Sequence, residues 1–151
     1  MIISIFLFSI PEALTLFYLA YSLLGKKAPM KRLVVMSVIF GVTIYLNRQS
    51  NDNYILSVIF SCVLSILLLK IVGSLEIYEA ITSGVMSLSV YLAIEFINVI
   101  TLQTIMGIDP TTMETDLTRR FLWFLPQIIA TLALSNLIRY FINHYGNRKC
   151  M

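Results

Sequence analysis

Long apolar runs separated by short polar stretches make up most of this chain of 151 residues. A helix needs about 20 mainly apolar residues to cross the hydrocarbon core of a bilayer. Of the residues, 58% are hydrophobic and 13% are charged, whereas soluble domains carry about 25% charged residues. A soluble core could not shelter so much apolar surface at this length. The sequence therefore predicts an all-α, polytopic integral membrane protein, a single domain built as a bundle of five transmembrane helices.

The five predicted spans differ in length. They cover about residues 2–24, 29–47, 54–72, 76–106 and 119–141. The second reaches spanning length only if Lys31 and Arg32 extend their charges to the interface and the helix begins near Pro29. The fourth is longer than a bilayer needs, so it is expected to tilt or to project beyond the lipid.

Basic residues around the spans predict the orientation, because cytoplasmic segments carry an excess of lysine and arginine. With the N-terminus outside and the C-terminus inside, three basic residues lie outside: Arg48, Arg119 and Arg120. The other eight lie inside: Lys26, Lys27, Lys31, Arg32, Lys70, Arg139, Arg148 and Lys149. No basic segment precedes the first span, so we expect an uncleaved anchor in the cell membrane of a bacterium rather than a signal peptide.

Two acidic residues fall inside predicted spans, Glu12 in the first and Glu95 in the fourth. An acidic residue at the centre of a membrane helix costs about 2.5–3.5 kcal/mol on insertion scales. Helical spacing places Glu95 on one stripe with Tyr91 and Asn98, and Ser9 and Thr15 lie near Glu12 in the same way. Both stripes are expected to face the interior of the bundle, because lipid would penalise either one.

Three interpretations of the two carboxyl groups remain open at this point. They can be structural, as protonated or hydrogen-bonded groups between helices. They can form a ligand or ion pocket that opens to the outside, with Arg119 or Arg120 as the counter-charge. They can also serve proton-coupled transport, although five short spans show no pair of inverted halves. The candidate ligand-binding or intramembrane polar residues are Glu12, Glu95, Asn98, Tyr91, Arg120 and Gln127.

Prolines and small residues give further expectations about the helices. Pro11 and Pro126 each remove a backbone hydrogen bond and favour a kink beside a polar residue. Small side chains at helical spacing allow close helix packing, and their hydroxyls can bond across the contact. The predicted packing seams contain Ser57, Ser61 and Ser65, then Ser83 and Ser87, then Ser37 and Gly41.

Several classes of function find little support in the sequence. No nucleophile elbow, phosphate loop or zinc pattern is present, so we expect neither an enzyme nor a cofactor. Cys62 and Cys150 are isolated thiols and His144 is the only histidine, so no metal site is predicted. Basic clusters interleaved with aromatic residues are missing, and nucleic-acid binding is not expected.

The stretch SIPEALTLFYLAYSLLGKKAPMKRLVV resembles the start of the membrane domain of certain Firmicutes sensor histidine kinases. These are the accessory-gene-regulator-like kinases that carry a GHKL ATPase domain. Further points of similarity are Arg48 after the second span, Glu95 in the fourth, and Leu125 with Pro126 in the fifth. The roughly ten residues after the fifth span hold no phosphoacceptor helix or ATP-binding domain, so kinase activity does not carry over. The resemblance implies a sensory or peptide-receiving membrane module.

The leading expectation is a sensor-like or regulatory membrane module that receives an extracellular ligand, such as a small peptide. It would act in the lipid bilayer as a homo-oligomer or through a separate signalling partner. One alternative is a small transporter or channel subunit that uses the intramembrane carboxylates. A second alternative is a structural assembly subunit, in which the acids only hold helices together.

Overall fold

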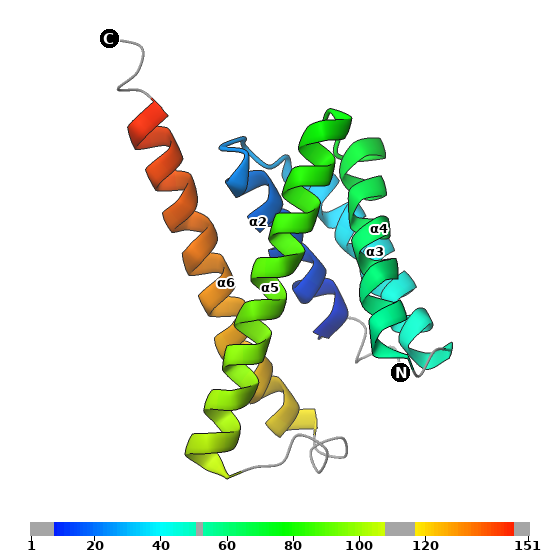
Figure 1. The fold of residues 1–151 in the computed structure, drawn as a ribbon, viewed down its shortest axis with the longest axis vertical. Helices are drawn as coiled ribbons and strands as arrows, with labels where there is room; N and C mark the ends of the chain where they lie inside the picture. The colour runs from blue at the N-terminus through cyan, green and yellow to red at the C-terminus, as the bar shows by residue number, and fades with distance from the viewer. Residues whose placement is uncertain (1–7, 51–52, 108–116, 147–151) are drawn as a thin grey trace.

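A computed structural model of the chain describes residues 8–50, 53–107 and 117–146, and this part is helical without a strand (Figure 1). The predicted start of the first span, at residues 2–7, lies outside the described residues. Each of the five helices overlaps one predicted span. The helices are α2 (Ile10–Leu23), α3 (Met30–Ser50), α4 (Tyr54–Ile71), α5 (Ile77–Met106) and α6 (Leu117–Gly146).

Local signals explain where several helices begin and end. Asn53 caps α4, because its side chain accepts a hydrogen bond from the backbone N–H of Ile55 at 3.1 Å. At the start of α5, the side chains of Glu76 and Glu79 form a reciprocal capping box. Gly107 ends α5 in the left-handed conformation, with a φ of 61°, which a residue without a Cβ adopts without strain.

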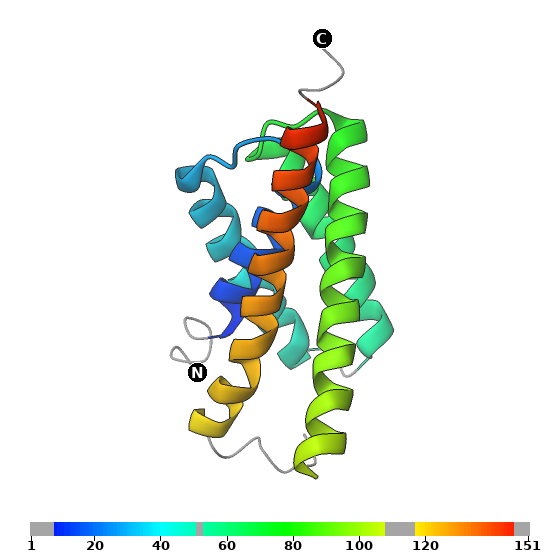
Figure 2. The ribbon, with the colours of Figure 1, turned by 90° about the vertical axis from the view of Figure 1, so that its left-hand side faces the viewer.

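Successive helices run in opposite directions, so the connections gather at two ends of the bundle (Figures 1 and 2). The α2–α3 and α4–α5 connections lie at one end, together with the last turns of α6; we call this the α2–α3 end. The opposite end carries the α3–α4 connection and is called the α3–α4 end. At the α2–α3 end, Lys26 Nζ lies 2.7 Å from Glu79 Oε1, which links the α2–α3 connection to α5.

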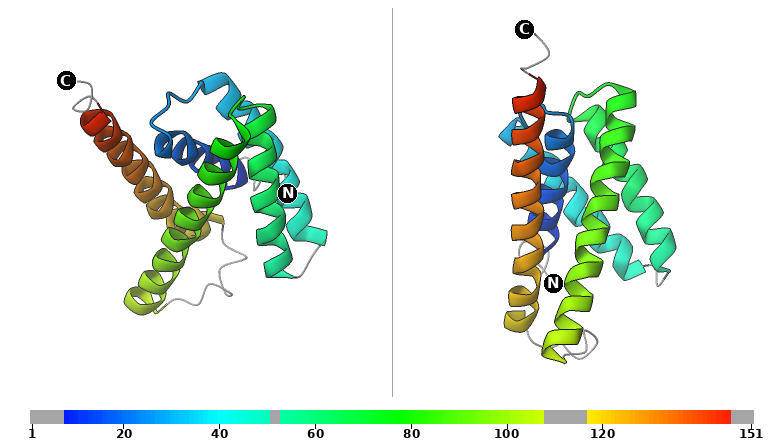
Figure 3. Two further views of the ribbon diagram at one scale, coloured as in Figure 1. Left: turned by 45° about the horizontal axis from the view of Figure 1, so that its top comes forward. Right: turned by 60° about the vertical axis from the view of Figure 1, so that its left-hand side comes forward.

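Helix α2 occupies the middle of the bundle. It contacts α3, α5 and α6, while α4 packs against α3 and α5 (Figure 3). Most of its side chains are buried, and Ala13, Phe17, Leu19 and Ala20 have no exposed surface, while Leu14 and Tyr18 are half-buried. A helix that is covered on most of its surface needs mainly apolar or small residues, and the sequence of α2 provides them.

Among the described residues, four helices are long and apolar enough to cross a membrane: α3, α4, most of α5, and Phe124–His144 of α6. Helix α2 is apolar but has only 14 residues in the described part, about 21 Å at 1.5 Å per residue. The outward faces of the longer helices expose large apolar side chains such as Ile59 and Ile71 on α4. The chain thus has the character of a membrane protein, while the number of crossings and their orientation remain predictions.

The serine seams predicted from the sequence are buried between the helices. Ser37, Ser65, Ser83 and Ser87 are at most 1% exposed, and Ser57 and Ser61 are 8% and 9% exposed. Most of these hydroxyls do not bond across the contact, because they donate to carbonyls of their own helix. Such bonds are made by Ser37 to Leu33, Ser61 to Ser57, Ser65 to Cys62, Ser83 to Glu79 and Ser87 to Gly84.

Gly41 allows α3 to approach the start of α2 very closely. A Cβ added at this glycine would lie 3.0 Å from the backbone oxygen of Ser9 and 3.2 Å from the backbone nitrogen of Ile10. Those atoms belong to the backbone and cannot move aside as a side chain can. The position of the first turn of α2 against α3 therefore depends on the small residue at position 41.

We expect Gly41→Leu to separate α2 from α3 and to destabilise the protein by about 1–3 kcal/mol, the usual range for overpacking. Thermal unfolding in a mild detergent measures the effect. Val42→Leu is the matched control, because its side chain is 37% exposed on the neighbouring, outward-facing position. Equal midpoints for the two variants would show that the helices are not in close contact at Gly41.

Candidate functional site

A pocket of about 400 Å³ lies among α2, α3, α4 and α5. Its volume is within the range of about 300–1,000 Å³ that is usual for small-molecule sites. The wall combines charged and polar groups with a continuous apolar surface. The lining residues are Glu12, Leu16, Phe40, Ile44, Arg48, Tyr54, Ser57, Val58, Ser61, Leu88, Tyr91, Leu92 and Glu95.

Glu12 and Arg48 bring opposite charges to the pocket from α2 and α3. Arg48 Nη2 lies 3.6 Å from Glu12 Oε1, and the side chains are 55% and 20% exposed. This separation is longer than the roughly 2.7–2.9 Å of a strong charge-assisted hydrogen bond. The pair is therefore loose, and the arginine stays largely open to its surroundings.

Glu95 supplies a second carboxylate from α5. It is partly buried, and it has no ion pair within 4 Å in the part of the chain that the structure describes. Arg48 is its favourable electrostatic neighbour. One arginine thus faces two carboxylates, which leaves the pocket with a formal excess of one negative charge when both acids are ionised.

Tyr91 lies between the two acids and differs from most buried tyrosines. Its side chain is only 2% exposed, and its hydroxyl has no hydrogen-bond partner among the described residues. The charges of Glu12, Glu95 and Arg48 all act on this hydroxyl, and the Glu12 carboxylate is its neighbour without meeting the distance and angle of a hydrogen bond. Most buried polar groups in proteins have a partner, so an unpartnered hydroxyl in a pocket wall points to a group that binds there.

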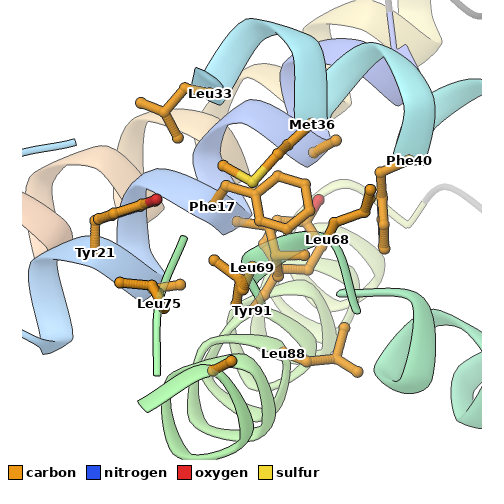
Figure 4. Close-up of a cluster of buried hydrophobic side chains, with 14 of the residues drawn as sticks. Phe17, Tyr21, Leu33, Met36, Phe40, Leu68, Leu69, Leu75, Leu88 and Tyr91 are labelled. Atoms are coloured by element: carbon orange, nitrogen blue, oxygen red, sulfur yellow. The ribbon is translucent and has the colours of Figure 1, made fainter. Parts of the chain in front are cut away.

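The apolar part of the pocket is continuous with the hydrophobic core. Leu16, Phe40, Ile44 and Leu88 line the pocket and also belong to the buried hydrophobic cluster. Figure 4 shows this cluster, with Phe40, Leu88 and Tyr91 among its labelled residues. The ring of Phe40 packs edge-on against Phe17, with 5.4 Å between centroids. This packing fixes the apolar wall in place, because both rings are almost fully buried.

Helix α4 adds hydroxyl groups to the opposite wall. Ser57 and Ser61 line the pocket, and Tyr54 lies at the start of the same helix. Asn47 Nδ2 donates to Ser57 Oγ at 3.2 Å, which ties the end of α3 to α4. The two serines therefore serve both as part of a packing seam and as polar lining.

The structure brings together only part of the predicted site. Glu12, Tyr91 and Glu95 line one pocket, whereas Asn98 is half-buried one turn further along α5 and does not line it. Gln127 is buried on α6, none of whose described side chains lines the pocket, and its backbone carbonyl accepts a bond from Thr131. Nothing is described of the side chains of Arg119 and Arg120, the predicted counter-charges.

The two prolines occupy different positions in their helices. Pro11 lies in the first turn of α2, directly after a π-helical turn at residues 8–9, whereas the sequence placed it in the middle of a longer span. Pro126 lies inside α6, is exposed, and precedes the buried Gln127.

Arg48 is the main site residue that sequence reasoning missed. It entered the argument only as a point of family similarity and as an outside charge. A signal was nevertheless present, because antiparallel neighbouring helices place the end of the second span beside the beginning of the first. Tyr54, Ser57 and Ser61 were assigned to an interface or a seam, since spacing alone does not separate seam from pocket lining.

Two buried tyrosines allow a matched test of the unpartnered hydroxyl. Tyr21 is 3% exposed and donates to the Gly73 carbonyl at 3.0 Å, so Tyr21→Phe should destabilise the protein by about 0.5–1.5 kcal/mol. Tyr91→Phe removes a hydroxyl that has no partner and should leave stability unchanged or raise it. Thermal unfolding of both variants in detergent gives the comparison; a larger loss for Tyr91→Phe would contradict this description of the site.

Comparison with family models, with curated protein sequences and with solved structures found no match to this chain. The resemblance to sensor-kinase membrane domains therefore stays a prediction from the sequence. The pocket itself, in which Glu12, Arg48, Tyr91 and Glu95 converge beside an apolar wall, is the feature that indicates a function.

Proposed function

We propose that this protein is a sensor-like module of a bacterial cell membrane, which receives a small ligand in the pocket and signals through a partner. The observation that carries the proposal is the pocket of about 400 Å³, whose wall holds an unpartnered buried Tyr91 hydroxyl beside Glu95. Polar groups buried only for packing would normally be paired with one another. A buried hydroxyl without a hydrogen-bond partner is better explained by ligand binding than by a structural role.

The position of the pocket favours reception from one side of the membrane. Its polar residues Arg48 and Tyr54 flank the α3–α4 connection, which the predicted orientation places outside. The basic residues Lys26, Lys27, Lys31 and Arg32 lie at or near the α2–α3 connection, where an inward-facing surface is expected. A ligand from outside would then meet the polar mouth first and the apolar wall afterwards.

Helix α2 offers a route from the pocket to the rest of the bundle. Glu12 faces the pocket near the start of this helix, while Tyr18 Oη donates to Asn136 Oδ1 on α6 at 2.8 Å. Further along, Tyr21 bonds to Gly73 just after α4. A small movement of α2 on ligand binding would therefore displace α6 and the α2–α3 end. A second copy of the chain or a separate partner would bind there and respond to the displacement.

The test measures from which side of the membrane a membrane-impermeant thiol reagent labels cysteines introduced into the pocket. Ser57→Cys and Ser61→Cys are made in a chain that carries Cys62→Ala and Cys150→Ser. We expect both thiols to react in intact cells, as Gln49→Cys does at the α3–α4 end. Lys31→Cys should react only after permeabilisation, which checks the orientation in the same experiment.

Ser87→Cys is the buried control, because Ser87 is 1% exposed and does not line the pocket. If the pocket thiols are as unreactive as this control, no ligand reaches the site and the structural interpretation holds. If they react from both sides of the membrane, the site belongs to a conducting path and transport is the better assignment. Reaction from one side alone supports reception.

A further inference from the structure

The charge balance of the pocket selects the kind of molecule that fits it. Glu12 shares its charge with Arg48 at 3.6 Å, but Glu95 has no ion pair in the described part of the chain. An isolated carboxylate is strongly disfavoured where water is scarce, and a cation beside it removes much of that penalty. An anionic ligand would instead meet an unpaired acid.

The Tyr91 hydroxyl adds a directional requirement. It is buried and unpartnered, and its lone pairs can accept N–H bonds from a donor that lies between it and Glu95. A primary ammonium group carries three N–H donors and no acceptor, which matches one carboxylate together with one hydroxyl oxygen. A quaternary ammonium has no N–H and cannot make the second bond.

The apolar wall excludes a bare inorganic cation as the best occupant. Leu16, Phe40 and Leu88 carry no charge, line the pocket and belong to the hydrophobic core. A hydrated ion gains nothing from such a surface, whereas an aliphatic or aromatic group buried against it gains about 25 cal/mol per Å². The occupant therefore needs an apolar portion beside its charge.

We propose that the ligand is an amphipathic primary amine, whose ammonium group binds between Glu95 and Tyr91 while its apolar portion packs against Leu16, Phe40 and Leu88. The inference rests on the proposed function and adds the chemical class of the ligand. Peptide N-termini and small organic amines share this chemistry. The pocket volume admits either, so the experiment includes a probe of each kind.

Binding is measured by equilibrium dialysis on the full chain in phosphatidylcholine nanodiscs. The probes are radiolabelled leucyl-phenylalanine amide, its N-acetylated form, and phenethylamine. The two dipeptides differ by one positive charge and have nearly the same apolar surface. We expect saturable binding of the free-amine dipeptide and at least tenfold weaker binding of the acetylated one. Stronger binding of phenethylamine than of the dipeptide would identify small amines as the source.

Three variants assign the effect to the proposed residues. Glu95→Gln should weaken binding of the free-amine dipeptide at least tenfold, and Tyr91→Phe should weaken it severalfold. Glu76→Gln is the matched control, because it removes an exposed carboxylate at the start of the same helix. It should leave the affinity for the free-amine dipeptide unchanged. Undiminished binding to Glu95→Gln, or equal binding of the acetylated dipeptide, would overturn the proposal.

A second measurement applies even if the variants bind no dipeptide. At Ser61→Cys, with the two native cysteines replaced, the labelling rates of a 2-aminoethyl and a 2-sulfonatoethyl methanethiosulfonate reagent are compared, because the first carries a primary ammonium group. The cationic reagent should react several times faster, and Glu95→Gln should lower that ratio. Fast labelling without a cationic preference would refute the amine while leaving ligand reception intact. Absence of any labelling would refute both.

Discussion

The burial of α2 at the centre of the bundle is the constraint on which the rest of the structure depends. Four longer helices surround or flank it, and its face near Glu12 is the one that borders the pocket. Because neighbouring helices cover most of α2, a carboxylate near its start lies mostly inside the bundle, with 20% of the Glu12 side chain exposed. The close approach of Gly41 to Ser9 then fixes the position of the first turn of α2, which carries that carboxylate.

Much of this arrangement could be predicted from the sequence. Hydropathy and length placed the helices, because crossing a bilayer requires about 20 apolar residues whatever the fold. The spacing of Ser83, Ser87, Tyr91, Glu95 and Asn98 predicted one inward-facing stripe on α5; the first three are buried, and the two polar residues beyond them are half-buried. The energetic penalty on intramembrane acids pointed to Glu12 and Glu95, which do line one pocket. These inferences depend on periodicity and solvation, and both can be read from a single sequence.

Other features required knowledge of which helices are neighbours. Arg48 lies beside Glu12, and predicting that pair requires the α2–α3 packing geometry, whereas the side chains of the predicted counter-charges Arg119 and Arg120 lie outside those that the structure describes. Gln127 is buried as a polar residue should be, yet it lies on α6, outside the pocket. Periodicity tells which face of a helix is covered, but it does not tell which helix covers it.

The internal bonding of the seam hydroxyls has a mechanical consequence. Since Ser65, Ser83 and Ser87 bond within their own helices, none of these hydroxyls holds α4 and α5 at a fixed longitudinal offset. Packed helices whose hydroxyls bond internally can slide by small amounts without breaking those bonds, which is the geometry of shear motion. Other helix pairs do have cross-helix bonds that oppose such sliding, among them Tyr18 to Asn136 between α2 and α6 and Asn47 to Ser57 between α3 and α4. The helices can therefore shift along their axes where their hydroxyls bond internally, while hydrogen bonds between helices hold them in place at a few positions.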